Sequence, residues 1–268
     1  MKAAASPHRA IDPIQAWLSG HLTLVYVFLY VPILVLVVLS FNKAGLPTVW
    51  SGFSLEWYAK LAGNEKLIGA VVNSLIIAFS ATAISTVIGT LLAMGLEERR
   101  PSVATEALIA APMIIPDIVM AISLLSFYSL IKFTLGVHSV ILSHCAFMIS
   151  FACAVVRTRF KQFDHSIIEA SIDLGASEIT TFRRITLPVI APGVIAAALL
   201  GFTLSFDEFI IAYFTSGPGA SSITFPMQIY AMIRFGVTPD VNAVATIVMF
   251  FSFLLIFLSQ RINRGGAA

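Results

Sequence analysis

The chain alternates between long apolar runs and short polar segments, and this pattern predicts a membrane protein. Six runs come close to the ~20 apolar residues that a helix needs to cross the hydrocarbon core of a bilayer. A single transmembrane domain over residues 22–260 is expected, between tails at 1–21 and 261–268. The sequence therefore predicts an all-α integral membrane protein with six transmembrane helices. These helices are expected at residues 22–41, 70–95, 105–130, 138–157, 189–214 and 241–260.

Composition strengthens this fold class and removes several functions. Hydrophobic residues make up 58% of the 268-residue chain and charged residues only 11%, a balance typical of polytopic membrane proteins. The net charge of +2 is too small to indicate a nucleic-acid partner. Cys145 and Cys153 would lie about 12 Å apart along one helix, beyond disulfide reach. The five histidines show no metal-ligand spacing, so no metal site is expected.

The distribution of lysine and arginine predicts which side of the membrane each loop occupies. Eleven of these residues fall on the side of the N-terminus and five on the other. Because basic residues are enriched in cytoplasmic loops, both termini and the loop at 158–188 are expected in the cytoplasm. The five residues on the opposite side are Lys43, Lys60, Lys66, Lys132 and Arg234.

The polar loop at residues 158–188 is predicted to form a hook of two short helices joined at a glycine. Before Gly175, Ile168 and Ile172 are four residues apart and share one helix face. Gly175 can turn the chain back without steric cost. Ser177 can then cap the second helix. A hook of this kind on the cytoplasmic side of a membrane protein is typical of a docking element.

The hook resembles the EAA loop of ABC-importer permeases, the loop that contacts the ATPase in that family. The family pattern reads EAA, three residues, Gly, nine residues, Ile-x-Leu-Pro. Ser171 departs from the second alanine but remains small, and Asp173 lies four residues from Glu169, on the same helix face. The residues that match the pattern are Glu169, Ala170, Gly175, Ile185, Leu187 and Pro188. The resemblance implies that these positions, with Ser171 and Asp173, couple the chain to an ATPase.

Two plainer interpretations of this loop remain open from the sequence. Ser166 and Glu169 have the spacing of a capping box, so Glu169 can also serve the start of its own helix. The whole segment can also be an ordinary cytoplasmic connector, although the full spacing of the pattern disfavours this.

Three acidic residues stand in runs that are otherwise apolar. Asp117 follows Pro112 and Pro116, two prolines that should kink or break the third helix. Asp207 and Glu208 interrupt the fifth run. A carboxylate at membrane depth costs about 2.5–3.5 kcal/mol on insertion scales. Each of these residues should therefore face a cavity, a cation or a partner subunit.

Structural roles compete with this interpretation as a transport pathway. Asp117 can cap the helix that resumes after the proline break, and Asp207 or Glu208 can pair with Arg234 or lie near the external surface. Trp50, in the first external loop, is either an interfacial anchor or part of a gate. The candidate pathway residues are Trp50, Asp117, Ser205, Asp207 and Glu208.

Beyond the hook, the resemblance covers most of the chain from Leu22 onward and is similar to the polyamine (spermidine/putrescine) branch of ABC permeases. It is carried by Trp50 and by the segments 115–119, 205–209, 216–219 and 236–246. The resemblance implies the type I importer permease fold in a bacterial inner membrane. It also implies a second permease subunit, more often different than identical, two ATPase subunits that bind ATP and Mg, and a periplasmic binding protein. No cofactor is expected on this chain.

Other cargoes and one other class of transporter are alternatives to this expectation. The same branch resembles importers of opines, aminobutyrate-type amino acids, aminophosphonates and ferric iron. A stand-alone secondary transporter could use the acids as a proton relay, but such folds usually show inverted repeats and more spans. The chain has no phosphate-binding glycine loop and no visible nucleophile–base pair, so neither an ATPase nor a membrane enzyme is predicted.

Overall fold

The computed structural model describes residues 13–45, 49–98, 101–161, 164, 166–234, 236 and 238–265. All named elements in these ranges are helical. The chain divides into two compact units. The terminal unit comprises residues 1–63 and 232–268, and the central unit comprises residues 64–231.

The terminal unit contains α1 (Pro13–Leu39), α2 (Glu56–Ala62) and α12 (Pro239–Gly265), and α12 packs beside both other helices. The link between α1 and α2 is held by Asn42, whose buried side chain donates to Val49 O at 2.7 Å. Asn42 O in turn accepts from the indole N–H of Trp57 at 2.8 Å. The Trp50 side chain stays 51% exposed. Trp57 is thus a structural residue of this loop, whereas Trp50 is free to contact lipid or protein.

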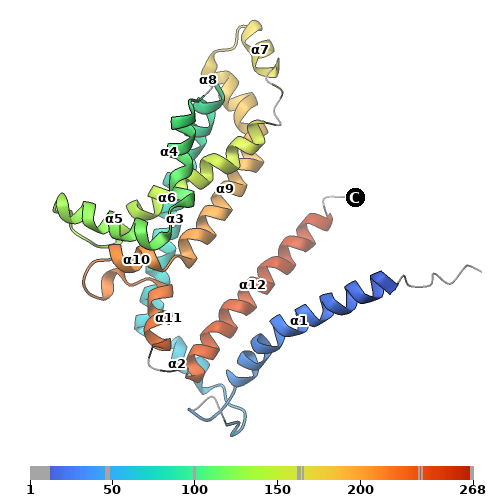
Figure 1. The fold of residues 1–268 in the computed structure, drawn as a ribbon, viewed down its shortest axis with the longest axis vertical. Coiled ribbons are helices and arrows are strands. Elements are labelled where there is room, and N and C mark those ends of the chain that lie inside the picture. Colours follow the sequence, from blue (N-terminus) through green and yellow to red (C-terminus); the bar gives the residue numbers. More distant parts are fainter. Residues whose placement is uncertain are drawn as a thin grey trace, which may run out of the picture. The chain divides into compact units, whose positions relative to one another are not determined.

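Three long helices form the bundle at the centre of the central unit, α3 (Glu65–Glu98), α6 (Val137–Phe160) and α9 (Leu187–Asp207) (Figure 1). Small residues on α3 allow its close approach to α6. A Cβ on Gly89 would lie 2.6 Å from the Cβ of Ala152 and 2.9 Å from the backbone nitrogen of Cys153. The two backbones are therefore nearly in contact at this point.

The third apolar run is broken at the prolines, as predicted. α4 (Val103–Ile114) and α5 (Asp117–Leu130) meet at an angle of 103°. Ile115 is extended, with φ −64° and ψ 130°, because a residue before proline is disfavoured in the helical region. α4 packs on α6, while α5 packs on α10 (Ile210–Thr215).

The fifth apolar run is also broken, which the sequence did not predict. α9 ends at Asp207, and Glu208 is extended, with φ −69° and ψ 125°. The chain then resumes as α10 after Phe209. The 3₁₀ turn η2 (Ala220–Ser222) and the short helix α11 (Phe225–Ile233) follow. Two hydrogen bonds from α3 hold the start of α11, because Ser74 Oγ accepts from Phe225 N at 2.8 Å and Asn73 donates to Ile223 O at 3.0 Å.

The hook lies at one end of the bundle and consists of α7 (Ser166–Asp173), α8 (Glu178–Thr181) and a π-helical turn, η1 (Phe182–Thr186) (Figure 1). α8, η1 and α9 follow one another without a break. Pro188 in the first turn of α9 has no N–H to donate. The π-helical turn comes directly before it, and there Leu187 N–H donates to Phe182 O, five residues back. The hook is thus joined to α9 through a continuous helical path.

Among the described residues, four helical segments are long and apolar enough to cross a membrane, and the bent α4–α5 pair makes a fifth. The four are Ile14–Leu39, Glu65–Glu98, Val137–Phe160 and Glu178–Asp207. The sixth expected span, at residues 241–260, lies in α12, where the apolar stretch counted is the shorter segment Pro239–Leu254. An all-helical membrane fold is therefore confirmed, and the sixth span stays a prediction.

Candidate functional site

The turn of the hook depends on Gly175, as predicted. Its φ is +83°, in the left-handed region that favours glycine. Gly175 N donates to Ile172 O at 2.8 Å, and Ala176 N donates to Ser171 O at 3.1 Å. These two bonds form the Schellman motif that ends a helix and reverses the chain. Ser177 then caps α8 by accepting from Thr180 N, which confirms its predicted role.

The two arms of the hook are joined by a hydrogen bond that the sequence analysis missed. Ser171 Oγ on α7 lies 2.9 Å from Thr181 Oγ1 on α8, and both residues are buried. The position that departs from the family's second alanine therefore supplies a cross-link inside the hook. The spacing of two hydroxyl residues ten positions apart does not reveal this pair, because the turn at Gly175 brings them together.

Glu169 does not make the capping-box hydrogen bond that its spacing allows. The Ser166 N–H that a capping box would direct to Glu169 donates instead to Asp164 Oδ1 at 3.0 Å. Glu169 and Asp173 are exposed on α7, as is Ala170. Ile185 is half-buried in η1, and Leu187 and Pro188 are exposed at the start of α9. The exposed acids remain available to a partner.

The hook encloses a groove of about 440 Å³ against the ends of α3 and α6. The predicted apolar pair, Ile168 and Ile172, lines this groove with Met94 and Phe160. Leu174 and Ile179 are 89% and 74% exposed near the turn of the hook. The hook thus has an apolar groove against its own base, which Ile179 also lines, and one almost fully exposed apolar side chain at its turn, Leu174.

An acidic cavity of about 730 Å³ lies where the two broken helices meet. It brings together three of the five pathway residues predicted from sequence, Asp117, Asp207 and Glu208. Asp117 is in the first turn of α5, while Asp207 ends α9 and Glu208 lies just beyond it. No Lys or Arg is found among the described residues that line the cavity. The other lining residues are Pro112, Met113, Ile115, Phe147, Phe151, Thr203, Leu204, Phe209 and Ile210.

The three carboxylates differ in how many hydrogen bonds their oxygens accept within the protein. Glu208 Oε1 accepts from Ile211 N at 2.7 Å, and its Oε2 accepts from Ala212 N at 2.8 Å, so Glu208 caps the start of α10. Its side chain is only 10% exposed. Asp117 and Asp207 are exposed and make no hydrogen bond or ion pair with the described residues. These two acids are free to meet a cation.

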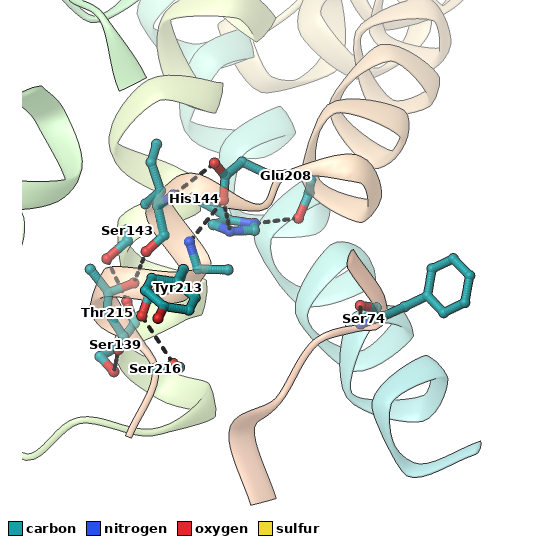
Figure 2. A network of polar contacts seen from close by, with 12 residues as sticks. Ser74, Ser139, Ser143, His144, Glu208, Tyr213, Thr215 and Ser216 are labelled. Atoms are coloured by element: carbon teal, nitrogen blue, oxygen red, sulfur yellow. Dashed lines mark hydrogen bonds and ion pairs between the residues drawn. The ribbon is translucent and has the colours of Figure 1, made fainter. Parts of the chain in front are cut away.

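His144 on α6 lies behind Glu208, and sequence reasoning missed it (Figure 2). Its side chain is fully buried, and its Nε2 is 3.4 Å from Glu208 Oε2. Its Nδ1 lies 2.7 Å from Ser205 Oγ on α9. A buried imidazole between two predicted pathway residues becomes visible only once α6 and α9 are packed together.

Of the remaining two pathway residues, Ser205 does not line the cavity. Ser205 is buried, with 3% exposure, and its hydroxyl is directed to His144 instead. Trp50 belongs to the terminal unit. The structure therefore groups Asp117, Asp207 and Glu208 around one space and places Ser205 in the layer behind them.

Comparison with known proteins agrees with this architecture. Residues 85–265 match the family described as binding-protein-dependent transport system inner membrane component. The chain is 40% identical to the spermidine/putrescine transport system permease protein PotC of Haemophilus influenzae, over 92% of this chain and 96% of the relative. It is 38% identical to the putrescine transport system permease protein PotI of Escherichia coli K12, over 87% and 85% of the two chains.

Solved structures give the same result for the fold. A chain of a bacterial ABC transporter involved in the import of the acidic polysaccharide alginate superposes with a TM-score of 0.75. The alignment covers 94% of both chains at 18% identity. A chain of the MetNI methionine ABC transporter in an inward-facing conformation gives a TM-score of 0.55 over 75% of this chain and 98% of that one. With two thirds of its length matched by the family and the same helical architecture, this chain belongs to the binding-protein-dependent transport system inner membrane components.

Proposed function

We propose that this chain is a permease subunit of an ATP-driven importer that moves a small cationic amine, a polyamine, from the periplasm to the cytoplasm. The acidic cavity carries this proposal. It places Asp117, Asp207 and Glu208 around one space, and no described lining residue is basic. Ammonium groups crossing a region of low dielectric constant require carboxylates of this kind. The names of the relatives PotC and PotI point to the same class of cargo.

The hook is proposed as the contact with the ATPase. Leu174 and Ile179 offer exposed apolar side chains for a cleft on that subunit, Ile179 from the groove of the hook, and Glu169 offers an exposed carboxylate on α7. Because α8, η1 and α9 are continuous, a displacement of the hook would pass directly to the helix that ends at Asp207. Rigid-body motion of this kind is a common means of switching access. ATP and Mg would be bound by two ATPase subunits, and this chain would need no cofactor.

The rest of the assembly follows from the family. A second permease subunit, different from this chain, would complete the pore, and a periplasmic binding protein would deliver the cargo. The chain would lie in the bacterial inner membrane as six spans, with both termini and the hook in the cytoplasm. The excess of Lys and Arg on the side of the N-terminus supports this orientation.

The test is uptake by the complete complex in proteoliposomes, with the cognate ATPase, second permease and binding protein. Labelled putrescine and spermidine should enter only when ATP and the binding protein are present. Asp207→Asn should reduce uptake, while Glu65→Gln, an exposed change at the start of α3 outside the cavity, should not. A binding protein that is thermally stabilised by opines, aminophosphonates or ferric ion and not by polyamines would overturn the choice of cargo. Uptake driven by a proton gradient without ATP would favour a secondary transporter instead.

A further inference from the structure

The side chain of His144 contacts two residues of the cavity wall, the carboxylate of Glu208 and the ring of Phe147. It is fully buried, and its Nε2 contacts Glu208 Oε2, the same carboxylate oxygen that accepts from Ala212 N of α10 (Figure 2). Its Nε2 lies 3.4 Å from Glu208 Oε2 but is not aligned as a hydrogen bond, and no other partner for this nitrogen is found within the described residues. A buried ring nitrogen without a closer partner costs free energy. Its position beside a carboxylate therefore needs an explanation beyond packing.

Glu208 selects the ring nitrogen that carries the proton, because the Ser205 hydroxyl can either donate to Nδ1 or accept from it. If the Ser205 hydroxyl donates to Nδ1 across 2.7 Å, the ring proton is on Nε2 and faces the negative carboxylate. In the other tautomer, the lone pair of Nε2 would face the Glu208 oxygens, and the two would repel. The second contact of a histidine sets its tautomer in this way in many sites. A chain of contacts from Ser205 to His144 and from His144 to Glu208 thus links the core of the bundle to the cavity wall.

We propose that His144 is a positioning residue of the transport pathway, which holds Glu208 as a fixed charge in the wall of the acidic cavity. The inference rests on the proposed function. Glu208, with both oxygens occupied, supplies negative potential and does not move with the cargo. Asp117 and Asp207, exposed and unpaired among the described residues, are the carboxylates that meet the ammonium groups. Ser205 acts one step further back, through the ring of His144.

Two substitutions of similar size separate positioning from packing. In His144→Gln the side-chain amide reaches the place of Nε2, so a donor still faces Glu208. In His144→Asn it reaches only the place of Nδ1, so the contact with Ser205 can persist while Glu208 loses its neighbour. The measurement is the amount of putrescine or spermidine taken up per ATP hydrolysed by the complete complex. We expect His144→Gln to stay close to the wild type and His144→Asn to fall about tenfold or more, as expected for one lost contact to a charged group.

A double-mutant cycle of Ser205 and His144, with a control at Thr203, tests the same contacts. Ser205→Ala should lower uptake per ATP, and its effect should not add to that of His144→Asn, because both break the same chain of contacts. Thr203→Ala, an exposed residue of the cavity two positions away, should add independently. Equal loss in the Gln and Asn variants, or additive effects of Ser205→Ala and His144→Asn, would overturn the proposal.

The failure of this inference can be distinguished from failure of the proposed function. A wild-type complex that takes up neither amine would contradict the proposed function. The same cycle can then be measured in the melting temperature of the detergent-solubilised complex, which needs no cargo. Non-additive shifts of the melting temperature would support the contacts between Ser205, His144 and Glu208, and additive shifts would contradict them.

Discussion

Gly175 is the residue at which a single substitution should do most to the hook. Alanine at φ +83° should cost roughly 1–2 kcal/mol locally, although no atom would obstruct its Cβ. We therefore expect Gly175→Ala to loosen the hook, detected by faster limited proteolysis between α7 and α8 and by lower uptake per ATP. Gly95→Ala is the matched control, because Gly95 is an exposed helical glycine with open space. Unchanged proteolysis and uptake in Gly175→Ala would contradict this view.

Ser171 and Thr181 allow a second test at single residues. Ser171→Ala restores the family's second alanine but leaves the buried Thr181 hydroxyl without its partner, which should destabilise the hook by about 1 kcal/mol. Thr181→Val should have a similar effect, and the double variant should be little worse than either single one. Thermal denaturation and limited proteolysis of the purified chain measure this. If the two effects simply add, the hydrogen bond does not contribute.

At the scale of elements, Arg157 joins three helices at the end of the bundle that carries the hook. Its Nε is 3.2 Å from Glu97 Oε1 on α3, and its Nη2 is 3.3 Å from Glu106 Oε1 on α4. Lysine has one compact charge and cannot reach both carboxylates in this way. We expect Arg157→Lys to release α4 more than α3, because Glu106 is 54% exposed and Glu97 only 20%.

Hydrogen exchange of the α4 amides measures this release. Faster exchange in α4 than in α3 is the expected result. The control is Lys60→Gln, which removes an exposed pair with Glu56 within α2 and should leave α4 unchanged, since exposed pairs contribute little. Equal protection of α4 in Arg157→Lys and the wild type would show that packing alone holds this helix.

The contact between α3 and α6 gives a further prediction for paired elements. Gly89→Ala should destabilise the bundle by about 1–3 kcal/mol, because its Cβ would overlap Ala152 Cβ. Ala152→Gly in the same chain should restore part of the stability but not all of it, since the backbone of Cys153 and Ile149 is also within 2.9 Å. The melting temperatures of the wild type, the single variant and the double variant decide this. Gly69→Ala, on the same helix with open space, is the control.

At the scale of the whole molecule, the orientation in the membrane can be tested by labelling introduced cysteines. Both native cysteines are buried, so the background should be low. Leu174→Cys on the hook should react with an impermeant maleimide only when the cytoplasmic face is open. Lys66→Cys, exposed at the start of α3, should react only from the periplasm. The reverse pattern would place the hook on the wrong side for an ATPase and contradict the proposed coupling.

Several features could be predicted from the sequence because they depend on local chemistry. Apolar runs predict helices, since a bilayer leaves no water for the backbone and only helices satisfy it within one segment. The break after Pro112 and Pro116 follows from the missing N–H and the restricted residue before proline. The turn at Gly175 and the cap at Ser177 were predictable for the same reason, because a few neighbouring residues determine each.

Other features could be decided only by the tertiary structure. Asp207 and Glu208 are adjacent in sequence and look alike, yet one is exposed in the cavity and the other caps α10. Ser205 was expected in the pathway, but the packing of α9 against α6 directs its hydroxyl to His144. The sequence by itself determined which residues are too polar to face lipid. Which of them meets an imidazole was decided by packing, because His144 lies sixty-one residues from Ser205 and sixty-four from Glu208 along the chain.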